Sequence, residues 1–149
     1  MIIPKQFFTT EIIVKRKPLS ENARRAGWVG CNIDISNVAE VGKVFLVKNS
    51  ELIDKQIVER SFRKTLFLRE KSSDAKGWLL DLMLCVDLIK KETFTLDDVY
   101  KFEGKLKLKY PNNNFIKDKI RQQLQILRDK GIIEFVSRGN YKKIVYGNI

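Results

Sequence analysis

The sequence predicts an α/β protein built from two units, and three observations support this class. The first half of the 149 residues carries two strand-like and two helix-like runs. A polar, small-residue cluster at 71–77 separates two apolar-periodic segments, which predicts a linker there and a division into residues 1–72 and 73–149. In the second half, a polar turn, a basic amphipathic helix and two β-prone runs follow one another, an order typical of a winged helix-turn-helix.

The N-terminal unit has too few elements to form a free-standing sheet. Thr9 or Thr10 is expected to cap a short helix through Ile12, Ile13 and Val14. The remaining expected elements are strands at 29–35 and 43–48 and a closing helix at 54–68. Two strands and two helices amount to about half a domain.

The C-terminal unit is expected to begin with two helices and a turn. Ser73 or Asp74 can cap the first helix, at 77–90, whose Trp78 and Met83 are expected in the core. Thr95 stands three residues before Asp98, which predicts a capped second helix that ends near Leu108. Pro111 stops this helix and leaves Asn112, Asn113 and Asn114 as the turn.

The helix that follows the turn has one apolar and one polar face. Ile116, Ile120, Leu124 and Leu127 are spaced by four, four and three residues and therefore share a face. The residues that point the other way are Asn114, Asp118, Arg121, Gln122 and Gln125. Amides and a guanidinium can bond to adenine and guanine edges, so this face has the chemistry for reading a major groove. The alternative is an ordinary solvated helix face.

The flanks of this helix favour nucleic-acid binding. Gly131 supplies a helix stop, and the runs at 132–136 and 141–145 are expected to form a hairpin, the wing, across 137–140. From Lys107 onwards ten Lys and Arg residues face three acidic residues, within a chain of formal charge +11. Such a surplus predicts contact with phosphates. The candidate DNA contacts in this unit are Asn113, Asn114, Lys117, Lys119, Arg121, Gln122, Gln125, Arg138, Asn140, Tyr141 and Lys142.

Composition argues against several other classes. The chain has no histidine, and Cys31 and Cys85 lie far apart, so neither a zinc site nor a disulfide framework is predicted and both thiols are expected to be buried. No apolar run approaches the roughly 18 residues of a membrane span, and residues 1–4 lack the regions of a signal peptide. We expect a cytoplasmic protein with no membrane partner.

Three segments, residues 17–33, 76–81 and 119–131, resemble in the same order the Dam-replacing family, the DpnI-like type II restriction endonucleases. The resemblance implies recognition of double-stranded DNA at GATC sites whose adenines carry N6-methyl groups. Members of the family combine an N-terminal nuclease domain of the PD-(D/E)xK kind with a C-terminal winged helix, and both recognise methylated DNA. Residues 1–72 would then be the C-terminal segment of the nuclease domain, and residues 73–149 the winged-helix domain.

The resemblance also assigns residues in the N-terminal unit. Arg24, Arg25, Gly27 and Trp28 match the RRAGW motif of the family. Two adjacent arginines suit phosphate or base contact, and the indole of Trp28 offers an apolar surface for adenine methyl groups, which makes Trp28 the candidate methyl sensor. The alternative is that Trp28 is a core side chain.

The resemblance places no catalytic residue in this chain. The metal-binding acids and zinc-binding cysteines of the family precede the matched region, so we expect no cofactor here and assign Mg²⁺ to the full-length family enzyme. Glu103 and Lys105 have the Glu-x-Lys spacing with Asp97 and Asp98 upstream, but they fall inside a predicted helix. Asp34 is not followed by such a motif.

Three functions therefore stand open. The first is methyl-directed DNA recognition within a restriction system. The second is transcriptional regulation, because winged helices serve many functions. The third is endonuclease activity, through a site not identified above or through completion of this chain by an upstream catalytic polypeptide.

Overall fold

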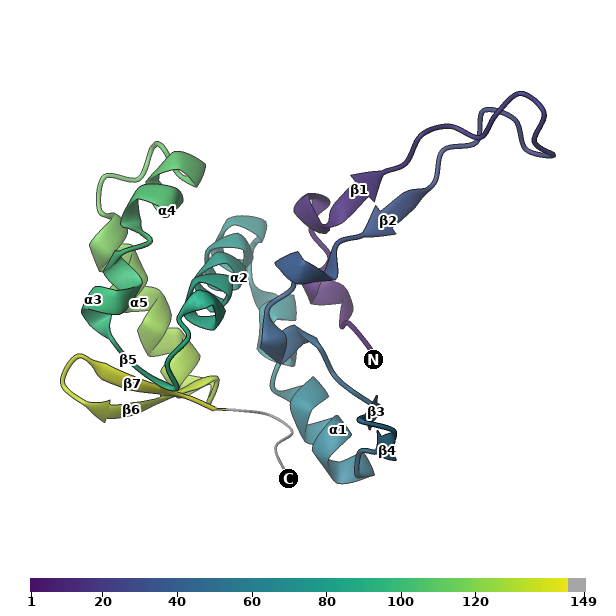
Figure 1. The fold of residues 1–149 in the computed structure, drawn as a ribbon. Coiled ribbons are helices and arrows are strands. Elements are labelled where there is room, and N and C mark those ends of the chain that lie inside the picture. The colour runs from purple at the N-terminus through teal and green to yellow at the C-terminus, as the bar shows by residue number, and fades with distance from the viewer. Residues whose placement is uncertain (145–149) are drawn as a thin grey trace.

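A computed structural model gives the protein as a mixed helical and β structure in which a long arm projects from a body of helices (Figure 1), and it describes residues 1–144. Residues 73–144 contain four helices: α2 (Ser73–Leu88), α3 (Leu96–Tyr100), α4 (Glu103–Lys109) and α5 (Ile116–Asp129). A three-stranded antiparallel sheet of order β5-β7-β6 packs beside them: β5 (Thr93–Thr95), β6 (Ile133–Ser137) and β7 (Asn140–Lys143). This is the arrangement of a winged helix-turn-helix, as the sequence predicted.

Helix α2 begins earlier than expected. The Ser72 hydroxyl accepts the backbone N–H of Ala75 at 3.4 Å, so the cap is Ser72 and the helix runs through Gly77. A Cβ added at Gly77 would lie 3.3 Å from the Tyr110 hydroxyl, so a close neighbour accounts for a glycine inside this helix. The expected linker is therefore helical from Ser73 onwards. Trp78 and Met83 are buried, as predicted.

The second predicted helix is interrupted. The capping box of Thr95 and Asp98 is confirmed, because each side chain bonds to the backbone N–H of the other residue at 3.1 Å. The helix then stops at Tyr100, and α4 begins at Glu103. Phe102, at the break, is partly buried against the core, and α4 follows α3 as a separate helix (Figure 1).

Helix α5 buries the predicted face. Ile116, Ile120, Leu124 and Leu127 are all buried, and Gly131 ends the helix with a φ of +65°. The Ile132 N–H then bonds to the Leu127 carbonyl at 2.8 Å, which satisfies a free carbonyl at the helix end.

The sheet contains the predicted hairpin and one further strand. The β6-β7 turn passes through Gly139 at a φ of +75°, and Asn140 Nδ2 donates to Ser137 Oγ at 2.9 Å across it. The expected second strand ends at Lys143, and Val145 lies outside the described residues. Strand β5 was not predicted. Its Phe94 is buried and stacks on Tyr141 with ring centroids 5.6 Å apart.

The N-terminal half has less regular structure than predicted. It contains two two-stranded ladders, one helix and several 3₁₀ turns: β1 (Ile13–Lys15) with β2 (Cys31–Ile33), β3 (Val47–Lys48) with β4 (Glu51–Leu52), α1 (Lys55–Arg63), η1 (Lys5–Phe7), η2 (Thr10–Ile12), η3 (Ile35–Asn37), η4 (Glu40–Gly42) and η5 (Leu66–Glu70). Ile13 and Val14 are in a strand, not in the expected helix, because they pair with Ile33 and Asn32. The expected closing helix ends at Arg63 and is followed by η5.

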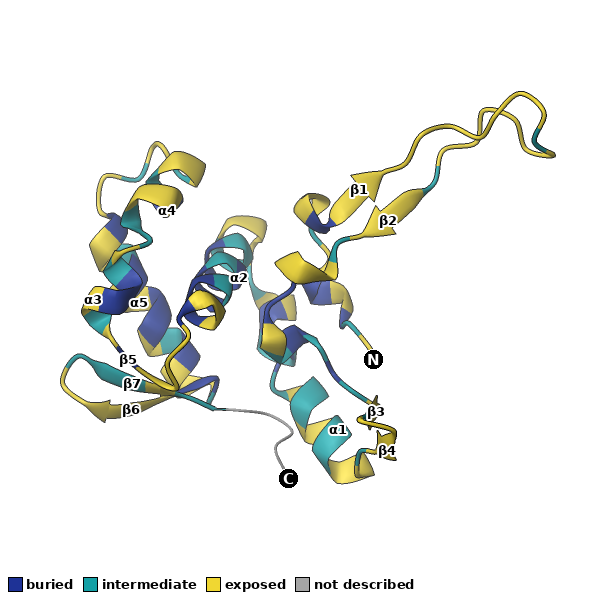
Figure 2. Ribbon diagram, in the orientation of Figure 1, coloured by how far each residue is buried: buried dark blue, intermediate teal, exposed yellow. Residues whose placement is uncertain are grey.

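The arm consists of β1, β2 and the residues 16–30 between them. Three backbone bonds continue the ladder beyond the strands: Arg16 N–H to Gly30 O, Leu19 N–H to Trp28 O and Gly27 N–H to Leu19 O, at 2.9–3.1 Å. Almost all of its length is exposed (Figure 2). Cys31 lies on this exposed arm, so the expectation of a buried thiol is wrong there. Cys85 is buried on α2, and burial raises the pKa of its thiol to about 11.

One hydrophobic core joins the two halves of the sequence. Phe7, Ile12 and Leu68 belong to the same buried cluster as the apolar residues of α2 and α5. The N-terminal half therefore packs on α2, the first helix of the winged-helix unit. Within the described residues 1–144, no helix has the length and apolar character that crossing a membrane requires.

Candidate nucleic-acid interface

The outer face of α5 is exposed, as the helical spacing predicted. Asp118, Arg121, Gln122 and Gln125 all reach solvent. Arg121 forms an ion pair with Asp118, and this hydrogen bond raises the pKa of the guanidinium. To contact a base, Arg121 would therefore have to exchange its ion pair with Asp118 for hydrogen bonds to a guanine edge.

The two lysines on α5 are anchored differently. Lys117 is half exposed, 3.5 Å from Glu103 and 5.3 Å from the centroid of the Tyr100 ring. Lys119 donates to Gln122 Oε1 at 2.9 Å. Both lysines lie in the first turn of α5.

The turn before α5 is fixed by a residue that sequence reasoning missed. The Lys107 ammonium donates to the carbonyls of Pro111 and Asn113, at 3.0 and 2.7 Å, and to Asn114 Oδ1 at 3.2 Å. Asn113 Oδ1 in turn accepts the Phe115 N–H at 2.8 Å. Asn113 therefore forms an Asx turn that fixes the backbone just before α5, while Asn114 keeps its Nδ2 donor for another partner.

A second set of contacts ties this turn to the body of the protein. Lys109 forms ion pairs with Asp81 on α2 and with Glu11 at the base of the arm, both at 2.6 Å. Burial opposes the charge of Lys109, but these two bonds outweigh it and raise its pKa. Tyr110 donates to Asp81 and stacks on Trp78 with centroids 3.9 Å apart, and burial raises the pKa of its phenol.

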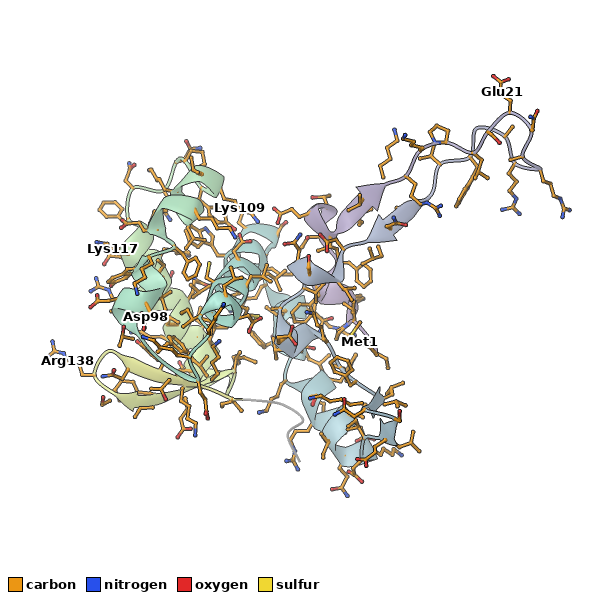
Figure 3. All side chains as sticks on the ribbon, viewed as in Figure 1. Met1, Glu21, Asp98, Lys109, Lys117 and Arg138 are labelled. Atoms are coloured by element: carbon orange, nitrogen blue, oxygen red, sulfur yellow. The ribbon has the colours of Figure 1, made fainter. Side chains whose placement is uncertain are left out.

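The four candidate residues of the wing have different environments. Arg138 is exposed at the hairpin turn (Figure 3), and Lys142 is exposed 3.4 Å from Glu92. Asn140 is engaged within the turn, and Tyr141 is half-buried between Phe94 and Phe135. Arg138 and Lys142 are therefore the wing residues best placed for phosphates.

The arm carries the other candidate residues. Arg24 and Arg25 are exposed near its tip, and among residues 1–144 no carboxylate forms an ion pair with either of them. Trp28 is 53% exposed, so its interpretation as a core residue is wrong. Its ring covers Gly30, where an added Cβ would lie 2.7 Å from Trp28 Cζ3. The indole is therefore held flat on the arm with one side open to solvent.

The structure separates the candidate residues into two groups. Arg138 on the wing and Glu21 at the tip of the arm lie at opposite ends of the molecule (Figure 3). The arm residues are thus not in one cluster with those of α5 and the wing, and the Lys109–Glu11 bridge connects the two regions.

The acidic residues do not form a metal site. Asp98 belongs to the capping box, and bonds from Lys101 and Thr95 hold its pKa well below the usual range. Glu103 lies on α4, where it pairs with Lys117. Asp34 accepts the Ser36 N–H at 3.0 Å and caps η3. In the part of the chain that the structure describes, no three His, Cys, Asp or Glu residues are grouped so that they could hold a metal ion.

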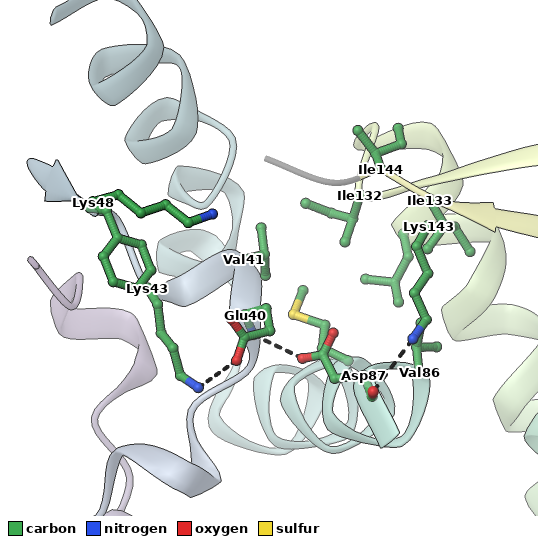
Figure 4. Close-up of a pocket in the computed structure, with 13 residues that line it drawn as sticks. Glu40, Val41, Lys43, Lys48, Val86, Asp87, Ile132, Ile133, Lys143 and Ile144 are labelled. Carbon is green, nitrogen blue, oxygen red and sulfur yellow. Dashed lines mark hydrogen bonds and ion pairs between the residues drawn. The ribbon is translucent and has the colours of Figure 1, made fainter. Parts of the chain in front are cut away.

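A cavity of about 250 Å³ lies where the N-terminal half meets α2 and the sheet (Figure 4). Asp87 accepts the Glu40 N–H at 2.8 Å at its edge, and burial raises the pKa of this carboxyl. Leu127, from the buried face of α5, also lines it. The cavity is therefore behind the recognition helix, away from the face that would meet DNA.

A helix-turn-helix with an exposed polar recognition helix and a basic wing defines a DNA-binding protein. Residues 74–143 match the family model described as the Dam-replacing HTH domain, and residues 1–71 match the model described as the Dam-replacing family. The chain belongs to the Dam-replacing family, which confirms the resemblance. Membership implies DNA binding and methylation-dependent restriction.

Proposed function

We propose that this chain recognises GATC sites in duplex DNA whose adenines carry N6-methyl groups, as part of a methyl-directed type II restriction system. The observation that carries the proposal is the ordered helix-turn-helix. Lys107 fixes the turn, and α5 presents Arg121, Gln122 and Gln125 outwards. A fixed turn is needed because base contacts depend on the depth and register of the helix in the groove.

The charged residues around α5 would set this register. Lys117 and Lys119 would contact phosphates beside the helix, and Arg138 and Lys142 would contact phosphates under the wing. These contacts carry affinity without sequence information. Arg121, Gln122, Gln125 and the free Nδ2 of Asn114 would supply the hydrogen bonds that distinguish bases.

The arm would supply a second contact with methylated DNA. Arg24 and Arg25 suit phosphates or base edges, and Trp28 is the proposed methyl sensor. Methylation replaces one N6 donor proton by an apolar group, so preference for the methylated site needs an apolar partner. The half-exposed indole of Trp28 supports this role because it offers such a surface on a fixed backbone.

No cleavage step follows from the described residues, because Asp98, Glu103 and Asp34 are engaged in caps and ion pairs. We propose that Mg²⁺ belongs to the full-length family enzyme and that a polypeptide with the catalytic acids is a partner of this chain. Purified alone, the chain should bind but not cut a fully methylated GATC plasmid with Mg²⁺ or Mn²⁺. Metal-dependent nicking that disappears in Glu103→Gln would refute this assignment and restore endonuclease activity to the chain itself.

Fluorescence anisotropy with four duplexes tests the proposed recognition: methylated GATC, unmethylated GATC, and a scrambled site with and without N6-methyladenine. The methylated GATC duplex should bind most tightly. The logarithm of the binding constant should fall with the logarithm of salt by about 0.9 for each phosphate contacted. Equal affinity for all four duplexes would leave a nonspecific DNA-binding protein, and tight binding to a different palindrome would favour a transcriptional regulator.

A further inference from the structure

Phe115 is an unusual residue at the start of the recognition helix. It is 71% exposed, which makes it the most exposed aromatic side chain of residues 1–144. Exposed apolar residues are common on protein surfaces, so exposure alone assigns no role. The helical spacing did indicate this exposure, because Phe115 lies off the apolar face that begins at Ile116 and therefore points away from the core.

The backbone of Phe115 is fixed although its ring is exposed. Its N–H bonds to Asn113 Oδ1 at 2.8 Å, and its carbonyl accepts the Lys119 N–H at 2.9 Å. The turn before it is held by the three bonds of Lys107. An exposed ring on a fixed backbone can bury its apolar surface against a ligand with little loss of backbone entropy.

The position of Phe115 points to DNA bases. Recognition helices contact base edges with their N-terminal residues, and Phe115 is the N-cap of α5. Lys117 and Lys119 follow it in the first turn of the helix. The ring also lines a shallow groove of about 590 Å³, together with the asparagine turn, Trp78 and Tyr110. A base edge that reaches the start of α5 would meet this ring.

The hydrogen bonds of the neighbouring Asn114 suit an adenine that lacks one of its N6–H donors. Unmodified adenine is read by an amide that donates to N7 and accepts from N6. In this protein the Lys107 ammonium already donates to Oδ1 of Asn114, so this oxygen is less able to accept a hydrogen bond from an N6–H. The Nδ2 group of Asn114 can still donate to N7. N6-methyladenine retains N7 and offers a methyl group where the N6–H would be.

We propose that Phe115 is the apolar contact by which the recognition helix distinguishes N6-methyladenine from adenine, with Asn114 donating to N7 of the same base. This inference rests on the proposed function. It adds a residue on the helix-turn-helix that senses the methyl group independently of Trp28 on the arm. Burial of one CH₂-sized group corresponds to about four-fold in affinity, which is the expected preference for each methyl group contacted.

The test uses the complete chain with Trp28→Ala as the background, so that the arm no longer contributes a methyl contact. Anisotropy titrations at fixed salt compare methylated and unmethylated GATC duplexes. Phe115→Ala in this background should remove the remaining four-fold preference per methyl, because it should lower affinity for the methylated duplex more than affinity for the unmethylated one. Leu108→Ala is the matched control, because Leu108 is an 85% exposed apolar residue on α4, outside the recognition helix, and its loss should change neither affinity.

Two further variants separate a direct contact from a change of fold. Phe115→Leu should keep most of the preference, whereas Phe115→Gln should lose it, and circular dichroism should be the same for both. Full methyl preference in the Phe115→Ala, Trp28→Ala protein would overturn the inference alone. Absence of methyl preference in the unmodified protein would overturn the proposed function, and this inference with it.

Discussion

The arm and the turn before α5 both present polar and aromatic side chains to solvent, but they are stabilised differently. The arm is stabilised by backbone bonds within its own hairpin, and its tip is exposed (Figure 2). The turn is fixed by Lys107 and tied to α2 through Tyr110 and Asp81. The position of the turn therefore depends on the core of the protein, whereas the position of the arm depends on the bonds of its own hairpin.

The largest expected effect concerns the core that supports the turn and α5. Leu124 is completely buried on the inner face of α5, so Leu124→Ala should lower the free energy of unfolding by about 2–5 kcal/mol. Urea unfolding followed by circular dichroism measures it. Arg24→Ala is the comparison on the arm and should change stability by less than about 0.5 kcal/mol. A large loss for Arg24→Ala would show instead that the arm is packed against the body of the protein in solution.

The next effect concerns base reading against phosphate contact. Arg121→Ala should weaken binding to the target by about 1–3 kcal/mol if the guanidinium contacts a base, and should weaken binding to random DNA much less. Lys142→Ala should weaken all sequences alike and lower the salt slope by about 0.9. Anisotropy titrations over a range of salt measure both. Equal losses on target and random DNA for both variants would remove Arg121 from the base-reading residues.

A smaller effect is expected at the cap of α3. Thr95→Ala removes the hydroxyl that accepts the Asp98 N–H and should lower the free energy of unfolding by about 1 kcal/mol. Thr93→Ala, at the other end of strand β5 and outside the capping box, is the control. Urea midpoints report the difference. Loss of stability of equal size in both variants would assign the effect to the strand instead of the cap.

The same cap predicts a dependence of stability on pH. Asp98 has a folded-state pKa below its ordinary value of 3.8, because Lys101 and Thr95 bond to the carboxylate. Its contribution to stability is therefore present above pH 4 and is lost as the pH falls below that value. Asp98→Asn should lose less stability between pH 4 and pH 2 than the unmodified protein. Asp97→Asn, an exposed neighbour outside the capping box, should follow the unmodified protein.

The features predicted correctly from the sequence depend on neighbours along the chain. The face of Ile116, Ile120, Leu124 and Leu127, the Thr95–Asp98 cap and the Gly131 stop are each set by residues a few positions apart. Each of these patterns is compatible with one local structure, so the spacing of the residues was enough to predict it. The outer face of α5 followed from the same spacing.

The features that the sequence did not reveal depend on tertiary contacts. The pairing of β1 with β2 joins exposed residues on either side of a long connection, and no alternation of apolar residues marks it. Strand β5 exists because Phe94 packs on Tyr141, far away in the sequence. Lys107 fixes the turn through its side chain, and nothing in its local spacing distinguishes it from the other lysines of α4.

The smallest expected effect belongs to the arm and distinguishes its two candidate roles. If Trp28 senses adenine methyl groups, Trp28→Ala should lower affinity for methylated GATC towards the unmethylated value, by about 0.8 kcal/mol for each methyl group that the indole contacts. If the arm contacts only phosphates, Trp28→Ala should leave the preference unchanged, while the Arg24→Ala, Arg25→Ala double variant lowers the salt slope by about 1.8. Because Trp28 is half exposed and covers only Gly30, its loss should not disturb the core, so circular dichroism should be unchanged. An unchanged methyl preference in a correctly folded Trp28→Ala protein would leave the helix-turn-helix as the reader of the methyl mark and the arm as an electrostatic contact.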